Sequence, residues 1–238
     1  MMSPKTCLLA AAAMTGLSGA AQAQDFYGTL MLGYSQQATD AEAYGNNVAV
    51  DPDFPALFDS GDGAVGAIGI GYAFNDSFRI EGRLGFHESD FNSRRVGTGA
   101  RAGEEYILNG DLKSTTLTIE GFYDIQNSTA ITPYLKAGVG VSRNHYSARL
   151  GGAGVSAFDA FDGVADGYYD AYADQSSTEF TWNVGIGASV QLSEKVVGFA
   201  EYQYISLGDA STGQDSFTDG FNVDADAHEI LFGIRATF

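Results

Sequence analysis

The stretch Glu229–Phe238 (EILFGIRATF) alternates between two kinds of residue along its whole length. One face carries Ile230, Phe232, Ile234, Ala236 and Phe238, and the other carries Glu229, Leu231, Gly233, Arg235 and Thr237. Because successive side chains of a β-strand point to opposite faces, this period predicts a strand with one apolar face. Such a strand suits a transmembrane β-barrel, where the apolar face meets lipid and the other face meets the interior.

Seven further segments repeat this alternation and complete the predicted fold. Each is close to the roughly 9–11 residues that a tilted transmembrane strand requires. The sequence therefore predicts an all-β protein, an eight-stranded antiparallel up-and-down transmembrane β-barrel. The seven segments are residues 26–35, 65–74, 78–86, 113–125, 133–141, 180–192 and 196–204.

The predicted connections alternate between short and long. Short turns fall at residues 75–77, 126–129 and 193–195. Outer-membrane barrels place short turns and both termini on the periplasmic side and long loops outside the cell. The aromatic residues also fall at two levels, as expected for anchoring at the two membrane interfaces. The predicted extracellular loops are residues 36–64, 88–112, 143–178 and 206–226.

The first 23 residues have the pattern of a secretory signal peptide. Lys5 supplies the charged region, Cys7–Leu17 the short apolar core, and Ala21–Ala23 an A-x-A cleavage site. We therefore expect a cleaved signal peptide over residues 1–23 and a mature barrel over residues 24–238. Cys7 is the only cysteine, so the mature chain is expected to contain no disulfide.

Composition narrows the range of partners. The formal net charge of the full chain is −18, which argues against nucleic acid, because phosphate binding requires a basic surface. The expected surroundings are outer-membrane lipid, lipopolysaccharide and the barrel-assembly machinery. A surface ligand of unidentified type is compatible with the long loops, and a monomer is expected.

Several motifs resemble one known family. They are Tyr27–Ser35 (YGTLMLGYS), Ile70–Phe86 (IGYAFNDSFRIEGRLGF), Pro133–Val141 (PYLKAGVGV), Glu201–Tyr204 (EYQY) and Phe232–Phe238. The chain resembles the OmpA-type and opacity (Omp25-like) eight-stranded outer-membrane barrels of the porin superfamily. The resemblance implies a barrel with paired charges inside, and a C-terminal assembly signal formed by Phe232, Ile234, Ala236 and Phe238. Ala236 departs from the pattern, since members of this family often have a larger residue there.

Charged residues inside the predicted strands are the most distinctive chemical feature. The register predicts an inward network of Arg79, Glu81, Arg83, Glu120, Lys136, Glu201, Glu229 and Arg235, with Asp124 and Lys113 also inward. A buried charge is tolerated only when it is paired and hydrogen-bonded. Because an eight-stranded barrel is just wide enough for side chains to fill it, the network predicts a plug. The alternative is a gated pore in which these residues exchange partners.

The long loops and the histidines give weaker signals. Residues 159–174 space five aspartates among aromatic residues, which suits either divalent-cation binding or simple solvation of the loop. His87 and His145 each precede a serine by two residues, but they fall at predicted strand ends, as residues at the base of loops. No phosphate loop, metal motif or cofactor motif is present in the sequence. No catalytic, cofactor-binding or metal-binding residues are predicted.

These observations favour a non-enzymatic outer-membrane barrel that maintains envelope integrity or makes surface interactions through acidic extracellular loops. A small porin that conducts ions or solutes is the alternative. A lipid-modifying outer-membrane enzyme is the third possibility, because other eight-stranded barrels have that activity.

Overall fold

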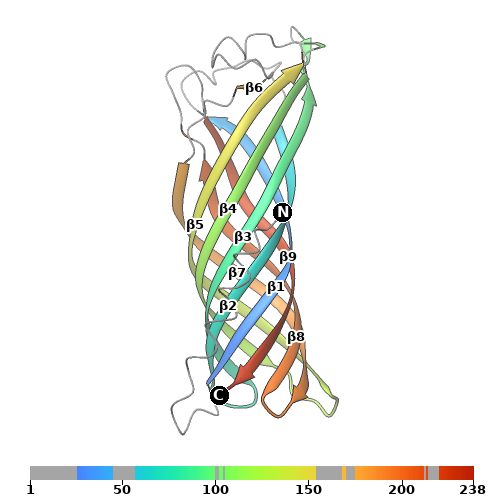
Figure 1. The fold of residues 1–238 in the computed structure, drawn as a ribbon, viewed down its shortest axis with the longest axis vertical. Helices are drawn as coiled ribbons and strands as arrows, with labels where there is room; N and C mark the ends of the chain where they lie inside the picture. Colours follow the sequence, from blue (N-terminus) through green and yellow to red (C-terminus); the bar gives the residue numbers. More distant parts are fainter. Residues whose placement is uncertain are drawn as a thin grey trace.

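A computed structural model of the chain describes residues 26–44, 57–99, 102–103, 105–153, 168–169, 175–211, 213 and 220–238. These residues form a closed antiparallel barrel with tilted strands (Figure 1). The eight-stranded fold is therefore confirmed. The barrel strands are β1 (Phe26–Tyr44), β2 (Leu57–Ala73), β3 (Phe78–Val96), β4 (Glu105–Asp124), β5 (Ile131–Ala153), β7 (Gln175–Ser193), β8 (Val196–Ser211) and β9 (Gly220–Thr237).

The pairing order runs β4-β3-β2-β1-β9-β8-β7-β5 and closes through β4 and β5. The two-residue strand β6 (Tyr168–Tyr169) lies outside this ring and pairs with Leu150 and Gly151 of β5. Within the residues the structure describes, no helix has the length and apolar character needed to span a membrane. The predicted signal peptide, residues 1–23, lies outside the described residues.

An apolar belt surrounds the outer face of the barrel. Strand pairing aligns the outward residues in rows, as where Leu30 of β1 pairs with Ile68 of β2 and Ile234 of β9. Outward side chains in this belt stay exposed although they are large and apolar, as the 62% exposure of Ile119 and 64% of Phe232 show. Such exposure is expected of a surface that faces lipid. No described residue that faces outward within the belt is charged.

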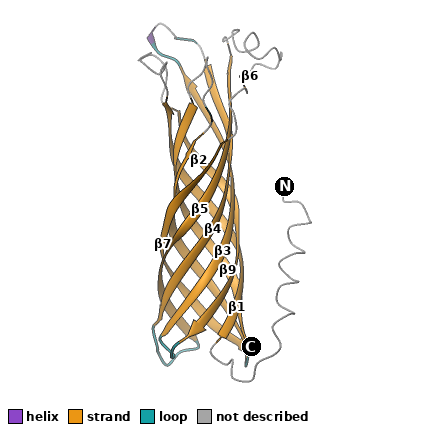
Figure 2. Ribbon diagram, turned by 90° about the vertical axis from the view of Figure 1, so that its left-hand side faces the viewer, coloured by secondary structure: helices purple, strands orange, loops and turns teal. Residues whose placement is uncertain are grey.

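The strands are longer than the sequence predicted. Much of each predicted long loop is strand, because β3 continues to Val96, β5 to Ala153 and β8 to Ser211. Strands of 16–23 residues exceed the roughly 9–11 that cross a bilayer, so the barrel continues well beyond the belt at the end away from the short turns (Figure 2). We call this part the upper barrel.

The hydrophobic pattern inverts in the upper barrel. Phe91 of β3 and Leu112 of β4 point inward and are buried. Outward positions at the same level hold charged residues such as Glu88, Asp90 and Arg143. The upper barrel thus has charged residues outside and buried apolar side chains inside, together with buried polar residues such as Ser89 and Asn144.

The lower rim is closed by short turns. Asn75 Oδ1 accepts hydrogen bonds from the backbone nitrogens of Ser77 and Phe78, both at 2.9 Å, which stabilises the turn between β2 and β3. The last residue completes the sheet at the same rim, where the Phe238 nitrogen donates to the Phe26 carbonyl at 3.3 Å.

Candidate functional site

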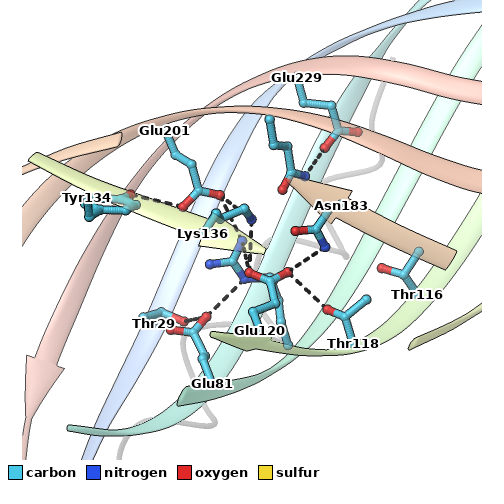
Figure 3. Close-up of polar contacts among 12 residues, drawn as sticks. Thr29, Glu81, Thr116, Thr118, Glu120, Tyr134, Lys136, Asn183, Glu201 and Glu229 are labelled. Carbon is cyan, nitrogen blue, oxygen red and sulfur yellow. Dashed lines mark hydrogen bonds and ion pairs between the residues drawn. The ribbon is translucent and has the colours of Figure 1, made fainter. Parts of the chain in front are cut away.

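The centre of the lumen holds a five-residue ion network (Figure 3). Arg83 lies 3.0 Å from carboxylate oxygens of Glu81, Glu120 and Glu201. Lys136 Nζ lies 3.0 Å from Glu120 and 2.7 Å from Glu201. We call these five residues the central network. They come from β3, β4, β5 and β8, so the network connects strands around most of the barrel.

Neutral side chains add hydrogen bonds to all three carboxylates, although Glu81 Oε2 has no hydrogen-bond partner among the described residues. Thr29 donates to Glu81 at 3.0 Å, and Tyr134 donates to Glu201 at 3.0 Å. Asn183 and Thr118 donate to Glu120 Oε1 at 3.2 and 3.1 Å. All five charged residues are buried. Burial of charge at this depth requires such pairing, so the network is a rigid filling rather than a set of loose side chains.

Arg79 forms a separate pair below the central network. Its guanidinium lies 2.8 Å from Asp124 and 3.9 Å from the centre of the Phe122 ring. Arg235 also belongs to this level, with its guanidinium 5.4 Å from the centre of the Tyr27 ring. The sequence predicted one continuous network in which Arg79 and Arg83 both flank Glu81. In the structure Arg79 instead pairs with Asp124, because that carboxylate projects into the lumen from the adjacent strand.

Glu229 lies in a third group, together with a histidine that the sequence analysis placed wrongly. His87 Nδ1 lies 2.7 Å from Glu229 Oε1, and Gln203 donates to Glu229 Oε2 at 2.5 Å. His87 is buried in the lumen and is not at the base of a loop. Its odd number places it on the same face of β3 as Arg79, Glu81 and Arg83, and that parity was the signal that could have located it. His145, by contrast, faces outward on β5 and lies 3.1 Å from Ser176 Oγ.

Lys113 was predicted to point inward, and this prediction is wrong. Its side chain is 57% exposed and lies 3.4 Å from the exposed Glu88. Lys113 shares the outward face of β4 with Leu117, because the two residues are four positions apart on a strand of period two. The lysine ends the apolar belt on this strand.

A second group of buried side chains lies in the lumen above the ionic groups. Aromatic and aliphatic side chains meet there, with the Phe91 and Tyr146 ring centres 6.4 Å apart in an edge-to-face arrangement. The sequence did not predict this layer, because these positions fall in the predicted loops. The buried apolar residues of the layer are Phe91, Leu112, Tyr146, Leu207, Ala210, Val223 and Ala225.

The remaining predicted features lie elsewhere. Phe232 and Ile234 are exposed on the outer face of β9, with Ala236 and Phe238 following at the lower rim. Their role as an assembly signal stays a prediction. The aspartates of residues 159–174 lie outside the described residues. Among the side chains that the structure describes, no three His, Cys, Asp or Glu residues group in a way that could hold a metal ion.

The chain is similar to known outer-membrane proteins. A family model described as outer membrane protein beta-barrel domain matches residues 8–238. The outer membrane protein PagN of Salmonella typhimurium is 29% identical over 188 residues, which cover 73% of this chain and 72% of PagN. Two solved barrels are also similar, each 17% identical. For Neisserial surface protein A the TM-score is 0.44, and the match covers 90% of this chain and 97% of Neisserial surface protein A. For OprG of Pseudomonas aeruginosa the TM-score is 0.48, and the match covers 89% of this chain and 96% of OprG.

Proposed function

Because this chain belongs to the outer membrane protein β-barrel family, we propose that it is a closed barrel that acts through its extracellular end, and is neither a pore nor an enzyme. Its role is envelope integrity or surface interaction. The observation that carries this proposal is the double filling of the lumen. The central network occupies one level, and the apolar layer around Leu112 and Leu207 occupies another.

Each level opposes conduction for a different physical reason. The central network fixes its charged side chains to one another across the lumen, so that a passing ion would have to break several buried ion pairs. The layer around Leu112 and Leu207 packs bulky buried side chains such as Phe91 and Tyr146 against one another, so a passing solute would have to displace them. A hydrophilic solute would therefore meet two successive barriers.

The upper barrel supports a role at the cell surface. Its polar outer face and buried apolar core make it a rigid extension that carries the remaining segments of the chain away from the lipid belt. In this orientation the short turns face the periplasm. The upper ends of β1 and β5, at Tyr44 and Ala153, then face the outside of the cell.

Planar-bilayer recording of the purified mature protein tests closure. We expect no steady conductance from the wild-type protein, and none from Glu194→Gln, a control change in an exposed short turn. Steady openings in the wild-type protein would instead establish a small porin. Channel openings that appear only in the double variant Leu207→Ser, Arg83→Gln would show that these two levels close the lumen.

Surface labelling tests the orientation. The mature chain is expected to lack cysteine, so Thr98→Cys at the upper end and Ser128→Cys in a short turn each introduce one thiol. An impermeant maleimide added to intact cells should label Thr98→Cys alone. Labelling of Ser128→Cys alone would reverse the proposed orientation.

Loop replacement separates the two proposed roles. Cells that lack the protein are complemented with the wild-type chain or with a variant in which residues 154–167 are replaced by a Gly/Ser linker of equal length. If the role is surface interaction, the variant should restore resistance to detergent but not attachment to host or neighbouring cells. Failure of the wild-type chain to alter either property would refute both roles.

A further inference from the structure

The outer wall formed by β4, β5 and β7 carries a patch of hydrogen-bond donors directly above the apolar belt. Strand pairing places Arg143 of β5 between Thr115 of β4 and Thr178 of β7. One row higher, it places His145 between Lys113 and Ser176. All six side chains face outward, and none is acidic. We call them the donor patch.

The row beneath the donor patch is entirely apolar. Leu117, Val141 and Phe180 are aligned by the same pairing, and each is at least half exposed. The step from Val141 to Arg143 is two residues, or about 6–7 Å along the strand. The donor patch therefore lies where the hydrocarbon region gives way to the headgroup region.

Arg143 is the group most available to a ligand. It is exposed, and no ion pair or hydrogen bond among the described side chains involves it. Lys113 already interacts with two acids. It forms an ion pair with Glu88 at 3.4 Å, and it attracts Asp111, which lies one step higher on the same face. Acids thus lie at both edges of the donor patch, with Glu88 and Asp111 beside Lys113 and the exposed Asp209 on β8, whose backbone oxygen accepts from Ser177 at 2.8 Å. Arg143 lies between these edges, and neither of its cross-strand neighbours is acidic.

Two other places on the wall have the reverse chemistry, one across the barrel on β1 and β2 and one on β8 and β9, next to β7. There the tyrosines at the top of the belt donate to aspartates, Tyr34 to Asp62 at 2.5 Å and Tyr204 to Asp226 at 2.7 Å. Carboxylates in those positions repel an anionic headgroup. The circumference of the barrel is therefore asymmetric, and of these three places the wall around Arg143 is the one that suits an anion.

We propose that the donor patch binds the phosphate groups of lipid A, with the acyl chains of that lipid lying against Leu117, Val141 and Phe180. This inference rests on the proposed orientation, in which the upper barrel faces the outer leaflet. Arginine suits phosphate because its fork of N–H groups matches two oxygens at once. The threonine and serine hydroxyls on either side provide further donors.

The apolar row favours a lipid over a soluble anion. A soluble polyanion would gain nothing from Leu117, Val141 or Phe180, whereas a lipid covers them and presents its charge at the height of Arg143. The phosphates of lipid A lie directly on its acylated sugars, so head and tails reach both rows together.

Binding of purified lipid A to the mature protein in zwitterionic micelles tests the inference. The unfolding midpoint and the lipid retained in native mass spectra are measured as lipid A is titrated. Each base near an anionic membrane surface contributes roughly 1 kcal/mol, so removing two corresponds to roughly a 30-fold loss of affinity. We expect the double variant Arg143→Gln, Lys113→Gln to show that loss.

Three controls make the result specific. Lys195→Gln removes a base from the short turn at the opposite rim and should change affinity less than two-fold. Arg143→Lys keeps the charge but loses the fork of N–H groups, so it should bind more tightly than Arg143→Gln and less tightly than the wild-type protein. Retained heat-modifiable migration on gels shows that each variant is folded.

Several outcomes would overturn the inference. They are unchanged affinity in the double variant, equal binding of lipid A from which the phosphates have been removed, and equally tight binding of phosphatidylglycerol. Full displacement of lipid A by a soluble sulfated polysaccharide would assign the patch to that polymer instead. Binding in micelles does not depend on which side of the membrane the patch faces, so it tests the donor patch alone. The proposed orientation is tested separately, by labelling of Thr98→Cys on intact cells.

Discussion

Arg83 and Glu201 stand on opposite sides of the barrel, and their side chains meet in the middle. Four strand-to-strand steps separate β3 from β8 in either direction around the ring, yet Arg83 Nη1 lies 3.0 Å from Glu201 Oε1. This pair therefore spans the full diameter of the lumen. It fixes the cross-section of the barrel in a way that the hydrogen bonds of the wall cannot.

The charge balance of the central network makes Arg83 its most sensitive member. The network holds two bases and three carboxylates. Arg83→Gln therefore leaves Lys136 as the one base of the network against Glu81, Glu120 and Glu201. We expect this change to lower the free energy of unfolding in detergent by about 3–5 kcal/mol, the usual cost of breaking a buried ion pair.

A double-mutant cycle checks the coupling. Glu81→Gln alone should cost less than Arg83→Gln, because it leaves two acids with two bases. Added to Arg83→Gln, it should restore part of the lost stability. Strictly additive effects would show that these side chains are not coupled.

Gly187 should not tolerate even a methyl group. A Cβ at this inward position would lie 2.2 Å from the Tyr134 ring and 2.7 Å from the Ala200 carbonyl. We expect Gly187→Ala to displace Tyr134 from Glu201 and to destabilise the barrel by about 1–3 kcal/mol, as overpacking does. Gly121→Ala is the matched control, because its Cβ would meet only the Ala137 carbonyl at 4.0 Å. Equal unfolding midpoints for the two variants would contradict this packing.

The apolar layer of the upper barrel should behave like the core of a water-soluble protein. Leu207 is completely buried, so Leu207→Ala should cost about 2–5 kcal/mol. Val96→Ala, at a position 59% exposed near the end of β3, should change stability by less than about 0.5 kcal/mol. Urea denaturation of both variants measures the difference, and a small effect at Leu207 would mean that this segment is not packed.

Two carboxylates oppose each other on the outer face of the upper barrel. Asp111 pairs with Asp90 across β3 and β4. Partial burial, together with Asp90, raises the pKa of Asp111 above its ordinary value. A raised carboxyl pKa means that the folded state prefers the protonated form, so stability is lost as the pH rises through that pKa.

Asp111→Asn should therefore stabilise the protein at pH 7–8, by about 0.2–1 kcal/mol for a cross-strand pair of like charges. The gain should shrink as the pH falls toward 4, since the wild-type carboxyl then takes up its proton. Thermal unfolding of the variant over this pH range measures the effect, with Asp76→Asn in a short turn as control. A gain independent of pH would exclude the carboxyl pair as its cause.

Phe238 is expected to matter for assembly more than for stability. Its ring lies beside Gly28 at the seam between β9 and β1, and its backbone nitrogen bonds Phe26. Phe238→Ala should reduce the amount of barrel inserted in cells while the purified protein still refolds in detergent. Phe74→Ala, another aromatic change at the same rim, should insert normally. Equal insertion of both variants would remove Phe238 from the assembly signal.

The sequence predicted the barrel well because lipid selects one simple pattern. Ile80 and Ile119 are exposed on the outer face while Glu81 and Glu120 are buried within, as the alternation requires. The same rule located most of the interior charges. Lys113 was misplaced only because the parity of β4 was not applied to it.

The upper barrel could not be predicted by that rule. Above the belt the surroundings change from lipid to water, so the apolar residues move to the inward positions, as Phe91 and Leu112 show. A search for apolar outward faces stops where this inversion begins, and the strand that follows then resembles a loop. The pairing partners inside the lumen also depend on side-chain reach across the barrel, which explains why the His87–Glu229 contact was missed.

The inversion of the pattern also fixes how deeply the protein is immersed. On β5, Val141 and Arg143 are neighbours on one face, and the change from apolar to charged occurs within that single step. A shift toward the short-turn end would draw Arg143 and Lys113 into hydrocarbon, and a shift the other way would expose Val141 and Leu117 to water. Vertical displacement is thus opposed in both directions, and bilayers of different thickness would have to adapt to the protein.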